Sequence, residues 1–347
     1  MCLTLIAALT ALAPAGVTVD EITMGGSALD RQQDPVYECH ATELSSDGQT
    51  VVGYGTPVPN SRHLGFTWSE VRGVRALPVP KEMEYAFSFC TASCISGDAK
   101  VMGGMGLWTE PDAKIAGKFK ARALPASALG KLPITDTSIE AINADGSVMV
   151  VKVSASKGDK LFLWSATKGL QRLSVTGSAS AISADGKVVG GVTFKVTNVA
   201  QKFGFVVSYG RYLQVPFRRG YFESTVDAVT ADGKLAFGNY WKEQESVGFI
   251  WKAGVASPTL LPDDFAFSAV SEKGEILAGW SKDKPALLIG KKVFPIKPFV
   301  KGYMPEEEAD KLTLVSVKKV KDTVYVLADS EGATTDYRIT IPMSRLR

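Results

Sequence analysis

The stretch Ser183-Ala184-Asp185-Gly186-Lys187-Val188-Val189-Gly190-Gly191 decides the fold, because it is one of six copies of a single pattern. Each copy starts with an aliphatic and a small polar residue; Asp, then Gly, and a closing Gly are each present in five of six. Asp-Gly between β-branched residues is a strong hairpin signal, since glycine readily adopts the positive φ of such a turn. A phosphate loop would occur once, between a strand and a helix, so the repetition indicates architecture. The copies are LSSDGQTVVGY (44–54), ISGDAKVMGGM (95–105), INADGSVMVVK (142–152), ISADGKVVGGV (182–192), VTADGKLAFGN (229–239) and VSEKGEILAGW (270–280).

The spacing of these copies predicts a β-propeller. The turns recur every 40 to 51 residues, which suits a blade of four strands, whose period is about 40 to 50 residues. An aromatic run follows most turns, and a run ending in Leu or Leu-Pro completes the unit; the aromatic runs are GFTW (65–68), LFLW (161–164), GFVV (204–207) and GFIW (248–251). We therefore expect an all-β fold in which the bulky aromatic side chains pack between neighbouring blades.

The two ends of the chain are expected to share one blade. A seventh unit can be traced in 312–317, 324–327 and 336–341, but it supplies only three strands. The alternating segment 17–22 stands alone before the first repeat, and we expect it to provide the fourth strand and close the ring. Seven blades of about 47 residues would account for the chain, with six or eight as alternatives, and residues 16–347 are expected to form a single domain.

Composition indicates a globular protein with a mixed surface. The 347 residues are 45% hydrophobic and 22% charged, and 39 basic residues face 36 acidic ones. Such a balance does not indicate binding to nucleic acid. The short basic clusters at 218–219, 291–292 and 318–321 lack interleaved aromatic residues and are interpreted as solvated strand faces or edges. We expect a monomer.

The first fifteen residues, MCLTLIAALTALAPA, are interpreted as a signal peptide for export to the periplasm, cell surface or extracellular space. They are apolar and end in small residues at alternate positions, but the basic start of a signal peptide is missing, so the true start is expected upstream. The segment is too short to span a bilayer, which takes about 20 apolar residues. The alternative is an apolar strand or helix packed against the body of the protein.

The Ile/Val-Ser-x-Asp-Gly-x-Val-Val-Gly hairpin followed by Gly-Phe-x-Trp resembles the probable extracellular repeats of the HAF family. The resemblance covers about residues 41–290, and the chain departs from the His-Ala-Phe signature, having Leu-Gly-Phe at 64–66 and Lys-Leu-Phe at 160–162. It implies an exported β-propeller-like protein and implies no catalytic residues.

The cysteines raise the possibility of a disulfide. Cys39 and Cys90 occupy the same place in consecutive repeats, six residues before Ser45 and Ser96. Equivalent positions on adjacent inner strands could bring their Cα atoms within disulfide range, and Cys94 is a second candidate partner for Cys39. Buried free thiols are the alternative.

No cofactor or metal site is expected. The chain has no Cys-x-x-Cys pair and only two histidines, His40 and His63, so neither zinc binding nor most histidine-dependent catalysis is indicated. The recurring aspartates of the turns could suggest calcium, but one aspartate per blade keeps them apart around a ring, and turn formation accounts for them.

Three carboxylates are the weak catalytic candidates: Glu43, Glu140 and Asp227, which the repeats place near the start of each blade's first strand. The leading hypothesis is a binding or scaffold module without catalysis, which presents loops and a central funnel to a protein or glycan partner. The alternative is a glycoside hydrolase or polysaccharide lyase that uses these carboxylates. The insertion at 109–121 and the acidic run at 305–308 are expected to be long loops, where recognition would lie.

Overall fold

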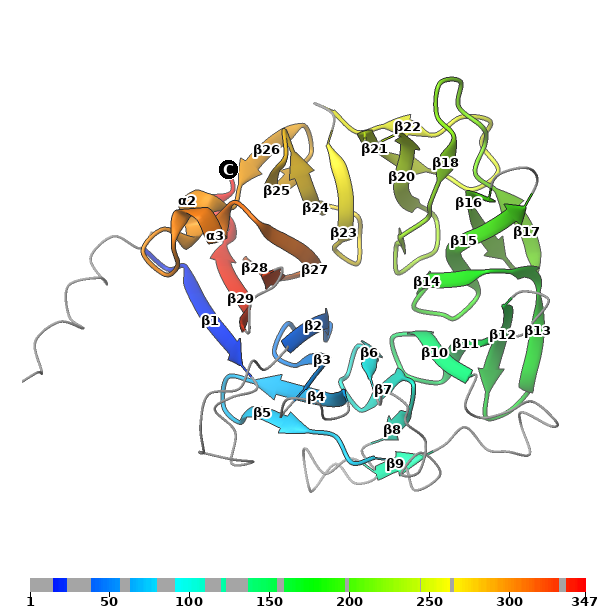
Figure 1. The fold of residues 1–347 in the computed structure, drawn as a ribbon, viewed down its shortest axis with the longest axis horizontal. Coiled ribbons are helices and arrows are strands. Elements are labelled where there is room, and N and C mark those ends of the chain that lie inside the picture. Colours follow the sequence, from blue (N-terminus) through cyan, green and yellow to red (C-terminus); the bar gives the residue numbers. More distant parts are fainter. Residues whose placement is uncertain are drawn as a thin grey trace, which may run out of the picture.

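Seven antiparallel sheets form a ring around a central axis (Figure 1). The computed structural model describes residues 15–23, 39–56, 63–79, 91–109, 120–122, 137–154, 159–196, 200–243, 245–262, 265–330 and 335–347. The sequence prediction of an all-β propeller with seven four-stranded blades is therefore confirmed.

Each blade runs from an inner strand at the axis to an outer strand at the rim. The strands of blade 1 are β2 (Cys39–Leu44), β3 (Val51–Gly55), β4 (Leu64–Ser69) and β5 (Gly73–Ala76). Blade 5 differs in having its inner strand interrupted, so that two short segments both pair with the second strand. Blades 2 to 6 are formed by β6 (Ala92–Ile95), β7 (Val101–Gly104), β8 (Leu107–Thr109) and β9 (Lys120–Arg122); β10 (Thr137–Ile142), β11 (Val148–Val153), β12 (Lys160–Ser165) and β13 (Gly169–Thr176); β14 (Ser178–Ile182), β15 (Val188–Val196), β16 (Ala200–Ser208) and β17 (Arg211–Gln214); β18 (Glu223–Ser224), β19 (Ala228–Val229), β20 (Ala236–Lys242), β21 (Glu245–Trp251) and β22 (Thr259–Leu260); and β23 (Ala266–Val270), β24 (Ile276–Ser281), β25 (Lys284–Ile289) and β26 (Lys292–Pro295).

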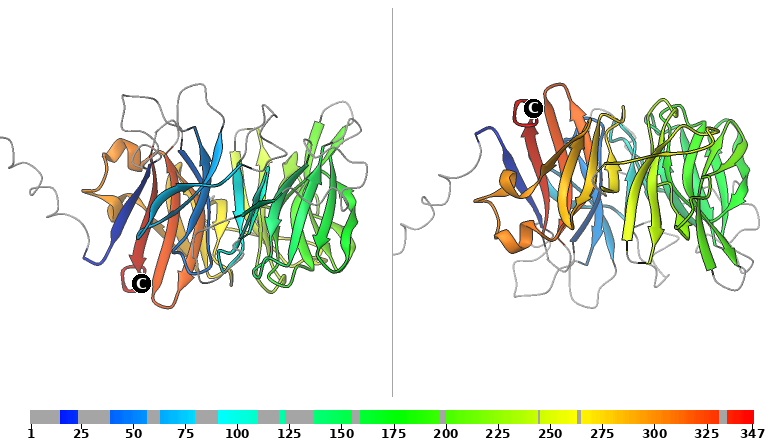
Figure 2. Two further views of the ribbon diagram at one scale, coloured as in Figure 1. Left: turned by 90° about the horizontal axis from the view of Figure 1, so that it is seen from below. Right: turned by 90° about the horizontal axis from the view of Figure 1, so that it is seen from above.

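Blade 7 contains both ends of the chain. Its inner three strands are β27 (Leu312–Val320), β28 (Thr323–Ser330) and β29 (Thr335–Pro342), and its outer strand is β1 (Thr18–Thr23). β1 pairs with β29 from Thr18↔Thr340 to Thr23↔Thr335, and the side views show the two strands next to each other (Figure 2). The expected closure of the ring by the N-terminal strand is thus confirmed.

Arg338 of β29 links the closing blade to blade 1. The residue is only 2% exposed. Its guanidinium donates hydrogen bonds to Asp20 of β1 (2.7 and 2.9 Å), to Glu70 (2.8 Å) and to the carbonyl of Gly48 (3.3 Å). It also lies over the Trp68 ring, 4.8 Å from the centroid. One buried cation therefore joins the N-terminal strand, the C-terminal strand and the first blade.

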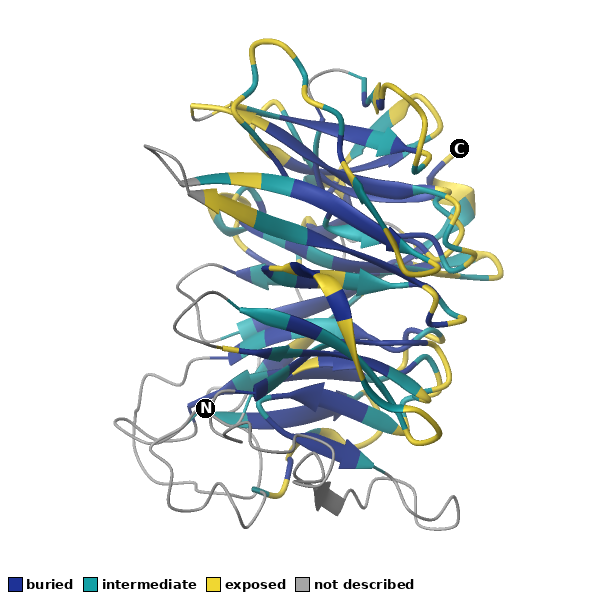
Figure 3. Ribbon diagram, turned by 90° about the vertical axis from the view of Figure 1, so that its right-hand side faces the viewer, coloured by how far each residue is buried: buried dark blue, intermediate teal, exposed yellow. Residues whose placement is uncertain are grey.

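The hydrophobic core lies between blades rather than at the axis. Strand centres are buried, whereas turns and outer strands are exposed (Figure 3). The phenylalanine of the aromatic run is fully buried in blades 1, 4 and 5, as Phe66, Phe205 and Phe249. Each aromatic ring buries about 150 to 250 Å², so these residues supply much of the contact that holds adjacent sheets together.

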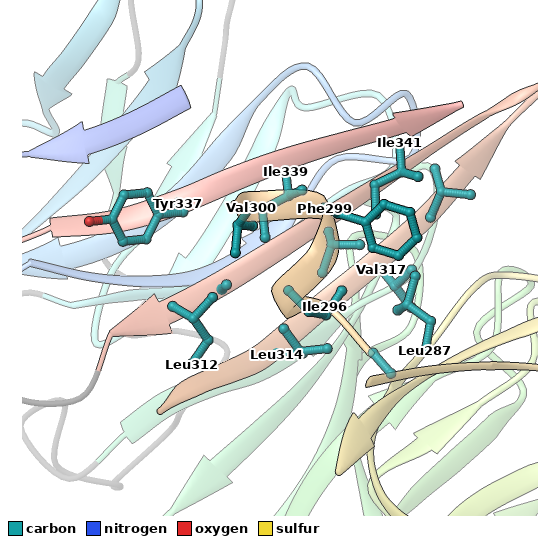
Figure 4. Close-up of a cluster of buried hydrophobic side chains, with 14 of the residues drawn as sticks. Leu287, Ile296, Phe299, Val300, Leu312, Leu314, Val317, Tyr337, Ile339 and Ile341 are labelled. Carbon is teal, nitrogen blue, oxygen red and sulfur yellow. The ribbon is translucent and has the colours of Figure 1, made fainter. Parts of the chain in front are cut away.

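The acidic run at 305–308 corrects one sequence expectation. It does not form a long loop: α3 (Glu306–Ala309) follows α2 (Lys297–Val300) on the outside of blade 7. Lys297 holds the two helices together through Glu306 (3.0 Å) and Asp310 (3.2 Å). Phe299 and Val300 enter the apolar cluster formed with Leu314, Ile339 and neighbouring residues (Figure 4).

A β-bulge in the inner strands explains the glycines that close the repeats. At these glycines a carbonyl of the inner strand lies where a Cβ of the second strand would stand. A Cβ at Gly191 would clash with the carbonyl oxygen of Ser178, and the same clash recurs at four equivalent glycines. These glycines and the carbonyls they face are Gly53 and His40, Gly104 and Thr91, Gly238 and Thr225, and Gly279 and Ala266.

We predict that Arg338→Met lowers the free energy of unfolding by about 3 kcal/mol, because it leaves Asp20 without its buried partner. Urea unfolding followed by tryptophan fluorescence measures the loss. Arg211→Met, at an exposed arginine of β17, serves as the matched control and should change stability by less than about 0.5 kcal/mol. Equal stabilities of the two variants would contradict a closing role for Arg338.

A second prediction concerns Gly191→Ala, which should destabilise the fold by about 1 to 3 kcal/mol through overpacking against the Ser178 carbonyl. Lys195→Ala, at an exposed position of the same strand, controls for the placement of alanine in β15. Thermal unfolding of both variants tests the bulge explanation, which predicts a lower Tm for Gly191→Ala alone.

Candidate functional site

The turns of the six repeats form a hydrogen-bonded collar around the axis. The collar consists of the residue between the small polar residue and Asp of each repeat: Ser46, Gly97, Ala144, Ala184, Ala231 and Glu272. The amide of Ser46 donates to the carbonyl of Gly97 (3.1 Å), and the amide of Gly97 donates to that of Ala144 (2.8 Å). In the same way, the amide of Ala184 donates to the carbonyl of Ala231 (2.9 Å), and the amide of Ala231 donates to the carbonyl of Glu272 (2.8 Å). Between blades 3 and 4 the Asn143 side chain donates to the Ala184 carbonyl instead (3.1 Å).

The turn aspartates serve the turns, as the sequence interpretation proposed. Asp185 accepts hydrogen bonds from the Ser183 hydroxyl (2.7 Å) and the Lys187 amide (3.1 Å), and the Ser183 hydroxyl accepts one from the Val188 amide (3.0 Å). The hydrogen bond from Ser183 lowers the pKa of Asp185. Each repeat therefore fixes its own turn, and the turn then holds a collar residue against the axis.

The bulge residues form a second layer inside the ring. Their side chains cross to the inner strand of the next blade: the hydroxyls of Thr42, Ser93 and Ser268 donate to the carbonyls of Ala92 (3.2 Å), Ile139 (3.5 Å) and Leu314 (2.6 Å). In each repeat the bulge residue sits two places before the aliphatic residue, so alignment of the repeats marks this position. Of the residues at this position, the sequence singled out only Glu140 and Asp227. The bulge residues are Thr42, Ser93, Glu140, Ser180, Ser268 and Val315, with Asp227 at the equivalent place of blade 5.

A cavity of about 310 Å³ lies within these layers and is lined by all seven blades. It brings together the three carboxylates singled out in the sequence, Glu43, Glu140 and Asp227. Glu43 and Glu140 lie in the second half of β2 and β10 rather than near strand starts as expected, because these inner strands begin several residues before the repeat becomes recognisable. Asp227 directly precedes β19, in keeping with the expectation. Glu272 and Lys318, which the sequence interpretation did not select, also line the cavity.

Glu43 and Glu140 both connect one blade to the next. Glu43 accepts a hydrogen bond from the amide of Ile95 (3.0 Å) and lies 4.0 Å from the Lys318 ammonium. Burial raises the pKa of Glu43, and the charge of Lys318 opposes this shift. Glu140 accepts from the amide of Ala179 (2.6 Å) and forms an ion pair with Lys152 (2.6 Å). Both carboxylates are therefore already engaged by protein donors.

Asp227 belongs to a buried network around Asn239. The Asn239 amide donates to Asp227 (3.0 Å) and to the Phe267 carbonyl (2.8 Å), and its oxygen accepts from the Phe267 amide (2.8 Å). Thr225 donates a further hydrogen bond to Asp227 (2.8 Å). Burial raises the pKa of Asp227 to about 6, although both donors favour the carboxylate. The network joins blades 5 and 6 and leaves Asp227 able to exchange a proton near neutral pH.

The predicted disulfide is not tested by the described residues. Cys39 is buried in β2, but Cys90 lies outside them, so pairing of Cys39 with Cys90 stays a prediction. The alternative pairing of Cys39 with Cys94 is not formed, since Cys94 is a free thiol 3.7 Å from the Ile139 carbonyl. Burial raises the pKa of the Cys94 thiol well above its usual value.

In the part of the chain that the structure describes, no group of three or more His, Cys, Asp and Glu side chains is arranged to hold a metal ion. Among the same residues, no helix is both long and apolar enough to cross a membrane.

Comparison with known proteins supports the fold and no specific family. No protein-family model and no curated protein matches the chain, so the resemblance to HAF repeats is not confirmed. Solved structures share the propeller. An oligogalacturonate lyase in complex with manganese gives a TM-score of 0.58 at 9% identity, covering 95% of this chain and 98% of that one.

Two more propellers are similar at the same level. The oligogalacturonate lyase from Vibrio parahaemolyticus gives a TM-score of 0.54 at 11% identity, covering 94% of this chain and 98% of that one. The β-propeller domain of the Trilobed protease from Pyrococcus furiosus, which has an open velcro topology, gives 0.54 at 10% identity over 89% of this chain and 98% of that one. In the present chain β1 closes the last blade, so the ring differs at that point.

We predict that the stability contributed by Asp227 falls as the pH rises from about 4 to about 6. Its folded pKa lies above the unfolded value of 3.8, so the folded state binds more protons in this range and loses that advantage above it. A shift of this size corresponds to about 2 to 3 kcal/mol. Asp227→Asn should remove this component from the pH dependence of urea unfolding, whereas Asp283→Asn, at an exposed turn, should leave it unchanged.

Proposed function

We propose that the protein is an exported β-propeller that acts as a binding or scaffold module, presenting its central cavity and loops to a protein or glycan partner without catalysis. The observation that carries the proposal is the lining of the cavity. Every blade contributes small or polar side chains to it, and Ser93 and Ser180 are exposed there. Concave sites with a few placed polar groups are the usual form of ligand sites.

The use of the carboxylates favours binding over catalysis. Glu140 is held by Lys152 and a backbone amide, and Glu43 is held by a backbone amide beside Lys318. A general acid or base must be able to reach the proton it transfers. Carboxylates that already connect neighbouring blades are better explained as supports of the ring.

A hydrolase or lyase that acts on polysaccharide is the second candidate. One observation favours it: burial raises the pKa of both Glu43 and Asp227, and shifted carboxyl groups in a polar cavity are typical of acid–base catalysts. Two of the similar folds are oligogalacturonate lyases, but identities of 9% and 11% show the fold alone. Cleavage of a polysaccharide that is lost in both Glu43→Gln and Asp227→Asn would favour this candidate.

Export of the propeller as one unit, residues 16–347, is part of the proposal. It is supported by the apolar composition of residues 1–15 and by their small residues at alternate positions. These residues lie almost wholly outside the part that the structure describes. Secretion of a reporter fused to residues 1–15 tests this step directly.

We predict that a partner found on glycan and peptide arrays loses at least tenfold in affinity with Ser180→Phe. The new ring would fill part of a cavity of about 310 Å³, and Ser180 is exposed to it. Ser257→Phe, at an exposed turn of blade 5, is the matched control and should bind normally. Titration by fluorescence anisotropy measures the affinities, and unchanged binding by Ser180→Phe would exclude the cavity as the site.

A further inference from the structure

Exposed aromatic side chains lie on two neighbouring segments, the connection between blades 4 and 5 and the end of β20. Eight large apolar side chains are exposed among the described residues, and three of them belong to these segments: Phe217 (74%), Phe222 (53%) and Trp241 (38%). Phe217 and Phe222 lie on the connection from β17 to β18, and Trp241 lies at the end of β20. The amide of Phe222 donates to the carbonyl of Trp241 (2.9 Å), so the two segments are adjacent. We call Phe217, Arg218, Arg219, Phe222 and Trp241 the aromatic patch.

The backbone that carries the patch is held in place by inward-facing groups. Tyr221 turns inward against the Tyr240 ring (5.5 Å between centroids), while its neighbour Phe222 remains exposed. The Tyr240 hydroxyl donates to the carbonyl of Pro216 (2.7 Å), and the Tyr221 amide donates to that of Arg218 (3.1 Å). The loop therefore has a fixed conformation that partly buries one aromatic ring and presents two. Such pre-organisation lowers the entropy lost on binding.

The charges next to the patch restrict the partner. Arg218 lies over the Tyr221 ring (5.9 Å), and neither Arg218 nor Arg219 forms an ion pair with another described residue. Arginine binds carboxylates through paired hydrogen bonds. Glu223 is opposite Trp241 in the ladder, and the hairpin tip beyond Trp241 carries exposed Lys242, Glu243 and Glu245, so acidic groups outnumber basic ones at this border.

We propose that the aromatic patch binds an acidic segment of a partner protein, which places an apolar side chain among Phe217, Phe222 and Trp241 and a carboxylate against Arg218 and Arg219. Exposed Phe, Trp and Arg on a fixed support have the composition of protein–protein hot spots. The glutamates at the border would repel a uniformly anionic membrane or polysaccharide, whereas a protein segment can vary its charge along its length. This inference specifies a surface for the binding role proposed above and rests on it.

The test uses the full chain and defined probes. Fluorescent ten-residue peptides with a central Phe or Leu, Asp and Glu on one side of it and uncharged residues on the other, are titrated by anisotropy, beside charge-reversed peptides in which Lys replaces every acid. Polygalacturonate and vesicles of phosphatidylglycerol are titrated in parallel. The proposal expects acidic peptides to bind with micromolar affinity and at least tenfold more tightly than their charge-reversed counterparts.

Variants then locate the binding. Phe217→Ser combined with Phe222→Ser, and separately Arg219→Glu, should each weaken peptide binding at least tenfold. Tyr209→Asn, which removes a 75% exposed aromatic ring beside Lys187, should not change it. Because all these side chains are exposed, unfolding curves should match those of the wild type, which excludes loss of fold as the cause.

Three outcomes would overturn the inference: no acidic peptide binds, only the polysaccharide or the vesicles bind, or peptide binding persists in the patch variants. These failures can be told apart from failure of the binding role. If a ligand found on the arrays binds the wild type but loses affinity in Ser180→Phe, the cavity is a binding site and the patch is not. If neither the arrays nor the peptides give a ligand, the binding role itself fails.

Discussion

Closure of the ring is the constraint on which the rest of the structure depends. A four-stranded blade exposes two faces, and its phenylalanines, such as Phe66 and Phe205, are buried only because a neighbour covers each face. Blade 7, the last in the ring, is completed by β1. The pairing of β1 with β29 joins segments more than three hundred residues apart. Arg338 reinforces this joint from within, since its hydrogen bonds reach both terminal strands and blade 1. Stability at the joint therefore contributes to the packing of every blade.

The inner wall shows how one repeated sequence produces both a framework and a cavity. Each Asp-Gly turn fixes a collar residue, and each bulge directs a polar side chain toward the next blade. The same groups line the cavity of about 310 Å³. Polar atoms at the axis thus serve first to connect blades, and a ligand would meet a surface whose hydrogen bonds are largely committed. Glu43 and Glu140 illustrate this, since each accepts a hydrogen bond from a backbone amide of the next blade.

Two surfaces of different character follow from this architecture. The cavity is polar and is built from the repeats, whereas the aromatic patch combines the connection from β17 to β18 with Trp241 at the end of β20. Connections of this kind can vary without disturbing the ring, because strand pairing and inter-blade packing do not depend on them. The rigid support of Tyr221 and Tyr240 gives the connection at blade 5 a fixed shape. Specific recognition is best sought there.

The sequence alone determined the class of fold, because turn chemistry and period are local properties repeated along the chain. It favoured seven blades over six or eight and predicted that the two ends share the last blade, and the structure confirmed both predictions. It also selected Glu43, Glu140 and Asp227, which the structure places in one cavity. Only the tertiary structure decided what those carboxylates contact, that residues 306–309 form a helix, and that Arg338 joins the ends. These features depend on residues that are distant in sequence and are brought together by curvature of the ring. No local pattern encodes which groups meet across it.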